Sequence, residues 1–164
     1  MSNSNNKVLI IGVGNPYRKD DGIGPYIIKL LQTQKEIEAD LLDGGTDGLT
    51  LIDYIKEYTQ VILIDAVNMG KPAGEIVCFS PAEVQLKIKN DSLSTHGFGL
   101  AEVLKLVKEL DIKTKIQIIG IQPQDISFGE GLSKVINDKI SEVIKIIKKT
   151  LEMRLKCVMP YQLK

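Results

Sequence analysis

Four aspartates and one histidine are the side chains of this sequence whose types and spacing could do chemistry. Asp20 and Asp21 stand side by side in GVGNPYRKDDGIGP, Asp43 ends LLD before two glycines, and Asp65 interrupts the apolar stretch VILIDAV. His96, the one histidine of the chain, lies in LSTHGFG. Carboxylates and an imidazole can hold a divalent first-row metal ion while leaving positions open, but they do not choose among zinc, iron, manganese and nickel. Carboxylates also serve as general acids and bases.

Each of these residues also has a simpler interpretation. Asp20 and Asp21 fit as solvated charges near the start of a helix, and Asp43 fits as the Asx residue of a turn. His96 fits as the neighbour of a helix cap. Asp65 is harder to explain in this way, because an acid inside an apolar strand costs several kcal/mol unless it is paired, hydrogen-bonded or coordinated.

The first glycine-rich stretch is not a dinucleotide-binding fingerprint. After Gly12 and Gly14, the third glycine position of G-x-G-x-x-G is held by Tyr17, so the close approach of a helix that this motif requires is not provided there. Two adjacent carboxylates also follow, where a phosphate would have to sit.

Apolar, β-branched stretches alternate with amphipathic ones along the chain, which is typical of strands and crossover helices. The pattern predicts an α/β fold of three layers, with a central, mainly parallel, five-stranded twisted sheet flanked by helices. The segment 74–80 is shorter and fits an edge strand, and Ser133 is a possible cap for the last helix. The predicted strands are 7–15, 39–45, 61–67, 74–80 and 115–123, and the predicted helices are 24–34, 49–58, 99–110 and 132–154.

The acids stand at the ends of three predicted strands. Asp20 and Asp21 follow the first strand, Asp43 lies at the end of LLD in the second, and Asp65 lies late in the third. In open α/β sheets the reactive crevice lies at the carboxyl ends of the strands, so we expect these acids and the loop of His96 to converge on one crevice.

Length and composition favour one domain over 1–164, with a polar tail at 1–6 and a second tail at 156–164. The 164 residues are 43% hydrophobic, and 21 basic side chains balance 21 acidic ones, so no net field favours nucleic acid or an anionic membrane. The start MSNSNNK lacks the apolar core of a signal peptide, and no apolar run is long enough to span a bilayer. We expect a cytoplasmic protein in which Cys78 and Cys157 are reduced and structural.

Four stretches taken together resemble a known family, the hydrogenase maturation proteases, which trim the C-terminus of [NiFe]-hydrogenase large subunits. They are GVGNPYRKDDGIG, LLDGGTDG, ILIDAV and STHGFGLAEVL, in the order and at the spacings typical of that family. The likeness runs from about Lys7 to the final helix and includes GIQP and GLS.

The resemblance implies a site and a substrate. The two metal-contacting acids of the family fall on Asp21 and Asp65, and its histidine falls on His96, so these three are the expected catalytic and metal-contacting residues. Asp20 and Asp43 are expected to support them. The implied reaction is removal of the C-terminal extension of a [NiFe]-hydrogenase large-subunit precursor. The nickel is supplied by the precursor, and no tightly bound metal of the protein's own is expected. Whether the metal or a carboxylate activates water stays open.

Two alternatives come from other classes. One is a metallochaperone that carries nickel without cleaving a partner. The other is an esterase like the peptidyl-tRNA hydrolases, which also begin with a strand and a Gly-x-Gly-Asn-Pro turn. Their catalytic histidine follows soon after that turn, whereas here no histidine precedes His96, and the balanced charge argues against a tRNA groove.

Overall fold

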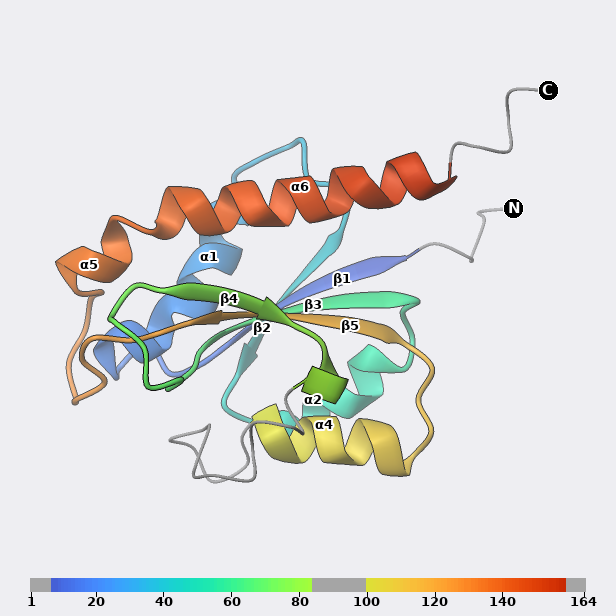
Figure 1. Cartoon of the computed structure of the whole chain (residues 1–164), viewed down its shortest axis with the longest axis horizontal. Helices are drawn as coiled ribbons and strands as arrows, with labels where there is room; N and C mark the ends of the chain where they lie inside the picture. Colours follow the sequence, from blue (N-terminus) through green and yellow to red (C-terminus); the bar gives the residue numbers. More distant parts are fainter. Residues whose placement is uncertain (1–6, 84–99, 159–164) are drawn as a thin grey trace.

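A single five-stranded sheet forms the centre of the molecule (Figure 1). The computed structural model of the chain describes residues 7–83 and 100–158. Neighbouring strands follow the order β2-β1-β3-β5-β4, and all pairs are parallel except β4 with β5. The strands are β1 (Val8–Val13), β2 (Asp40–Gly45), β3 (Gln60–Ala66), β4 (Ile76–Phe79) and β5 (Lys115–Ile121). The predicted mainly parallel sheet and its edge strand are confirmed.

Helices cover both faces of this sheet and make three layers (Figure 1). One face packs against α1 (Ile23–Gln32) and α6 (Ile140–Val158), and the other against α2 (Gly48–Ile55) and α4 (Leu100–Glu109). Alternate residues of each strand serve the two cores, because successive side chains of a strand point to opposite faces. Those facing the α1 and α6 layer include Ile10, Ile62 and Ile119, and those facing the α2 and α4 layer include Leu9, Leu63 and Ile118.

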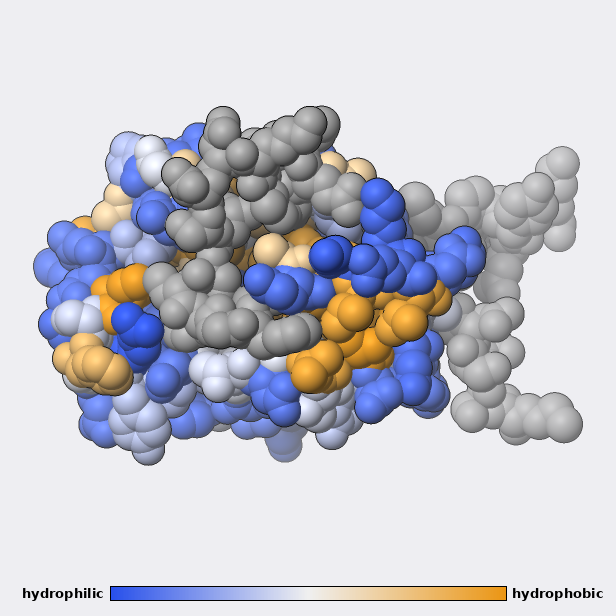
Figure 2. Space-filling model, turned by 90° about the horizontal axis from the view of Figure 1, so that it is seen from below, coloured by the Kyte–Doolittle hydropathy of each residue, from blue (hydrophilic) through white to orange (hydrophobic). Residues whose placement is uncertain are grey.

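The outer surface of the α2 and α4 side is largely hydrophilic, with apolar side chains gathered in a few patches (Figure 2). This contrast is expected of amphipathic helices that cover a sheet. Among the helices of the described residues, none combines the length and the apolar character needed to cross a bilayer.

The end of the chain differs from the prediction. The predicted helix 132–154 is two helices, α5 (Lys134–Asn137) and α6, and α6 continues to Val158. The break falls after Asn137 and Asp138, whose side chains favour turns over helix interiors. Ser133 occupies the N-cap position of α5, but its side chain makes no capping hydrogen bond.

The connections place the topological switch point of the sheet between β1 and β3. The chain leaves β1 through α1 and adds β2 on one side, and after α2 it adds β3 on the other side of β1. Such a reversal is the switch point at which open α/β sheets bind their ligands.

Candidate active site

Glycines let the loop after β1 lie directly on the sheet. A Cβ added at Gly12 would meet the carbonyl oxygen of Gly24 at 2.2 Å, and one at Gly24 would meet that of Val13 at 2.3 Å and that of Ile64 at 2.7 Å. The first turn of α1 is therefore in backbone contact with β1 and β3. This close approach sets the acids of the preceding loop over the switch point.

Asp21 sits in the short 3-10 helix η1 (Lys19–Gly22), which the sequence pattern did not predict. Its side chain is buried, and its Oδ2 accepts a hydrogen bond of 2.8 Å from the backbone N–H of Asn15. Gly14 makes room for this arrangement, since its φ is +139° and a Cβ there would lie 1.9 Å from the carbonyl oxygen of Asp21. The loop is thus built closely around one carboxylate.

Asp65 lies near the carboxyl end of β3 and is 4% exposed. Its neighbours Leu63 and Val67 face the α2 and α4 layer, so the alternation of the strand directs Asp65 to the same side. Among the described residues, no hydrogen-bond partner reaches its Oδ1. Burial raises the pKa of Asp65 well above its ordinary value, the charge of Asp21 raises it further, and the Ala66 N–H lowers it to a smaller extent. The predicted pair of acids is therefore brought together.

Asp20 has a different environment, although it is fully buried. Its Oδ2 accepts hydrogen bonds of 2.9 Å from the backbone N–H groups of Gln124 and Asp125 and from the Ser133 hydroxyl, and its Oδ1 accepts one of 2.7 Å from the Ser133 N–H. Asp20 therefore ties the loop of Asp21 to the segment that follows β5. The Ser133 hydroxyl, expected to cap the last helix, is used here.

Asp43 lies near the carboxyl end of β2, on the far side of β1 from Asp65, and its side chain is exposed. Its Oδ1 accepts a hydrogen bond of 3.1 Å from the N–H of Gly45, which is the turn role that its sequence context allowed. Its proposed supporting role in the site stays a prediction.

His96 lies outside the described residues. Within residues 7–83 and 100–158, no group of three His, Cys, Asp or Glu side chains could hold a metal ion. The pair Asp21 and Asp65 offers carboxylate oxygens, which suit divalent first-row ions in combination with imidazole. The segment of His96 leads directly into α4, which packs on the side of the sheet that Asp65 faces.

Gln122 is a buried residue of this edge that the sequence reasoning missed. Its Oε1 accepts a hydrogen bond of 2.7 Å from the N–H of Met69 and one of 3.3 Å from that of Lys71, and its Nε2 donates to the Asn68 Oδ1 at 3.2 Å. It therefore orders the loop that follows Asp65. The polar residue directly after the apolar strand, in GIQP, was the available signal.

Solved structures that superpose on this chain include hydrogenase maturation proteases. The chain superposes on the hydrogenase maturating endopeptidase HybD from E. coli with a TM-score of 0.78 and 26% identity, over 90% of this chain and 93% of that one. It superposes on the [NiFe] hydrogenase maturation protease HybD from Thermococcus kodakarensis with a TM-score of 0.73 and 30% identity, over 88% and 98%.

Sequence comparison agrees with the structural class. The family model for hydrogenase maturation protease matches residues 25–150. A putative hydrogenase maturation protease from Methanocaldococcus jannaschii is 33% identical over 74% of this chain and 75% of its own length. The hydrogenase expression/formation protein HupD from Thiocapsa roseopersicina is 31% identical over 87% of this chain and 66% of its own length. The chain belongs to the hydrogenase maturation protease family, and the prediction of a peptidase is confirmed.

Proposed function

We propose that this protein removes the C-terminal extension of a [NiFe]-hydrogenase large-subunit precursor after nickel has been inserted, and that it does so in the cytoplasm. Asp21, Asp65 and His96 contact the nickel that the precursor carries, and the protein binds no metal tightly by itself. Membership of the hydrogenase maturation protease family supports the reaction class. The same membership leaves the peptidyl-tRNA hydrolase alternative without support.

The observation that carries the proposal is the buried carboxylate of Asp65. An acid that is 4% exposed, with an Oδ1 that has no donor among the described residues, is costly in the free protein. A cation that arrives at this edge would neutralise both Asp65 and Asp21 and would recover that cost. A nickel ion held by the precursor meets the requirement, because carboxylate and imidazole donors suit such an ion while the precursor supplies the rest of its coordination.

The raised pKa of Asp65 suits a sensor. In the free protein its carboxyl group tends to keep a proton, because burial and the charge of Asp21 both disfavour the ionised form. Contact with a cation requires that this proton be released. Asp21, whose Oδ2 accepts the Asn15 N–H, is held in place to share the same ion or to orient a water molecule.

The decisive experiment compares nickel-loaded and nickel-free precursor as substrates. Purified protein is mixed with each form, and the mass of the large subunit is followed with time. We expect shortening of the nickel-loaded precursor alone, together with weak nickel binding by the isolated protein in calorimetry. Equal cleavage of the nickel-free precursor, or cleavage that depends on zinc added to the protease, would favour a conventional metallopeptidase.

The metallochaperone alternative predicts a different result. A carrier binds nickel tightly by itself and leaves the mass of every precursor unchanged. Tight nickel binding without any cleavage would therefore replace the proposed function with nickel delivery.

A further inference from the structure

Exposed aromatic side chains gather where two loops meet beside the acids. The acid loop (residues 15–22) and the β5–α5 loop (residues 123–133) form this surface, called the seam below. The chain has only 5 Tyr, 3 Phe and no Trp, yet Tyr17 in the acid loop is 65% exposed and Phe128 in the β5–α5 loop is 83% exposed. Tyr26, in the first turns of α1 beside the seam, is 41% exposed. Exposed aromatic side chains in this concentration are typical of binding surfaces.

The two loops hold each other firmly. The Lys19 N–H donates to the Gly129 carbonyl at 2.9 Å, and the Gly129 N–H donates to the Tyr17 carbonyl at 2.9 Å. The Arg18 Nε donates to the Ile126 carbonyl at 3.1 Å. With the four hydrogen bonds to Asp20 described above, these contacts fix the backbone from which the aromatic side chains project. Such preorganisation lowers the entropy that binding would cost.

Arg18 connects the two loops through its side chain as well. Its guanidinium carbon lies 5.4 Å from the centre of the Phe128 ring, within the range of a cation–π interaction. Arg18 therefore helps to fix the Phe128 ring while that ring keeps most of its surface in solvent.

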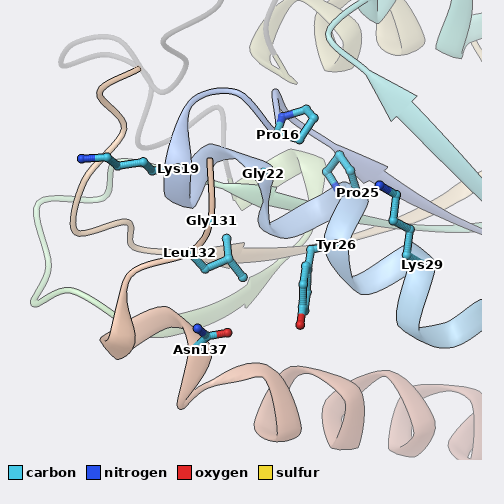
Figure 3. A pocket seen from close by; sticks show the side chains of 9 residues that line it. All are labelled: Pro16, Lys19, Gly22, Pro25, Tyr26, Lys29, Gly131, Leu132 and Asn137. Carbon is cyan, nitrogen blue, oxygen red and sulfur yellow. The ribbon is translucent and has the colours of Figure 1, made fainter. Parts of the chain in front are cut away.

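A pocket of about 290 Å³ continues the seam toward α5 (Figure 3). Pro16, Pro25 and Leu132 contribute apolar surface to it, and the Tyr26 side chain extends from α1 toward Asn137. The lining residues, all in the described part of the chain, include Lys19 and Lys29 but no acid. The volume suits an amino-acid side chain better than a whole drug-sized ligand. Lys19 is paired with Asp125, so Lys29 is the cation of this lining that favours an apolar or acidic segment over a basic one.

We propose that the seam is the docking surface for the precursor polypeptide, with Tyr17 and Phe128 as aromatic anchors and the pocket as the subsite for one apolar side chain of that polypeptide. The inference rests on the proposed function and adds a substrate-binding surface to it. The location of the seam supports the precursor polypeptide as its ligand, because Tyr17 lies in the same short loop as Asp21, one of the residues proposed to contact the nickel of the precursor. An extended polypeptide also covers a rim and a pocket together, whereas a small molecule fills only one of them.

The test uses the full-length protein and the nickel-loaded large-subunit precursor from the same cells. The Tyr17→Ala/Phe128→Ala double variant is compared with wild type and with Tyr54→Ala. Tyr54 is a matched control, because it is an exposed tyrosine (45%) on α2, which covers the opposite face of the sheet from α1. We expect the double variant to raise the KM for the precursor about tenfold with kcat unchanged, as loss of uniform binding predicts, while Tyr54→Ala changes neither. Tyr26→Ala should give a smaller rise in KM.

Binding measured separately distinguishes the two proposals. The affinity of each variant for the immobilised precursor is recorded beside the cleavage kinetics, and far-UV dichroism checks the fold. Cleavage by wild type with the same KM in the double variant and in wild type overturns the docking surface and leaves the proposed function standing. Binding by wild type that weakens in the double variant, without cleavage by either, overturns the proposed function and supports the surface. Absence of both binding and cleavage in wild type overturns both.

Discussion

Asp20 and Asp65 are buried carboxylates at the same edge of the sheet, yet their surroundings are opposite. Asp20 accepts four hydrogen bonds, three of them from backbone N–H groups, whereas the Oδ1 of Asp65 has no partner in the described part of the chain. Donors make the first carboxylate a structural support, since they replace the water lost on burial. The Oδ1 of the second has no such replacement among the described residues, and a buried polar atom of this kind in a native protein calls for an explanation, of which the proposed contact with a cation is one.

Asp21 links these two carboxylates. It follows Asp20 in the chain, its Oδ2 accepts the Asn15 N–H, and it is close enough to Asp65 to raise the pKa of that carboxyl group. The two-residue sequence DD therefore places one acid that ties two loops together, Asp20, next to one that acts on Asp65. Burial alone does not separate them, because both are buried.

The contrast between Asp20 and Asp65 predicts that the largest effect of substitution is on the rate of precursor cleavage. Asp21→Asn and Asp65→Asn should each lower the rate of precursor cleavage by about 100-fold or more, because the amide cannot take the charge or exchange the proton. The substitutions change side-chain volume very little, so the fold should persist. A cleavage gel and far-UV dichroism on the same samples measure both properties. His96→Gln is expected to behave in the same way.

Wild-type processing by any one of these three variants would remove that residue from the site. Asp43→Asn provides a comparison at an exposed acid of the same sheet edge and should have a milder effect than any of them.

The contrast next predicts a loss of stability at Asp20. In Asp20→Asn the amide NH2 must face an N–H donor in either orientation, because both carboxylate oxygens accept from N–H groups. We expect the free energy of unfolding to fall by about 3 kcal/mol. Urea denaturation measures this change through the midpoint at constant m-value.

Ser133→Ala is the matched control, because it removes only the hydroxyl donor and leaves the three N–H donors in place. It should cost about 1 kcal/mol. At a temperature where the variant is folded, Asp20→Asn should also retain more processing activity than Asp21→Asn. Equal stability of Asp20→Asn and wild type would show that the four hydrogen bonds do not support the loop.

Sequence patterns were sufficient for the sheet because its signals are local. Apolar strands, amphipathic helices and the acid after each strand can be read without knowing what packs against them, and the switch point then brings Asp21 and Asp65 together. The support given by Asp20 could not be predicted in this way. Its donors, Gln124, Asp125 and Ser133, lie more than 100 residues away in the chain.

The same reason explains two errors near the end of the chain. Ser133 before a helical stretch reads as a cap, but its hydroxyl donates to Asp20, a partner that no local pattern shows. The break after α5 falls at Asn137 and Asp138, two residues that prefer turns. The helical spacing of apolar residues over 132–154 predicts one continuous helix in spite of them. The turn preference of individual residues is a weaker signal than the helical period of apolar residues, yet the folded chain follows the turn preference here.

The last predicted effect concerns the pH dependence of stability and returns to Asp65. Because burial and Asp21 raise its native pKa above the unfolded value near 3.8, the native state binds the proton more tightly than the unfolded state. The contribution of Asp65 is therefore most favourable below about pH 4 and is lost as pH rises toward the native pKa. Asp65→Asn removes that loss, so in the presence of a chelator the variant should be more stable than wild type at pH 8 by about 1–3 kcal/mol. The difference should shrink toward zero near pH 4.

Thermal or urea unfolding of both proteins from pH 4 to 8 measures this difference. Asp53→Asn, at an exposed acid of α2, is the control, and its unfolding midpoint should stay that of wild type. A variant less stable than wild type at pH 8 would mean that donors already compensate the Asp65 carboxylate, and the contrast with Asp20 would no longer mark the site.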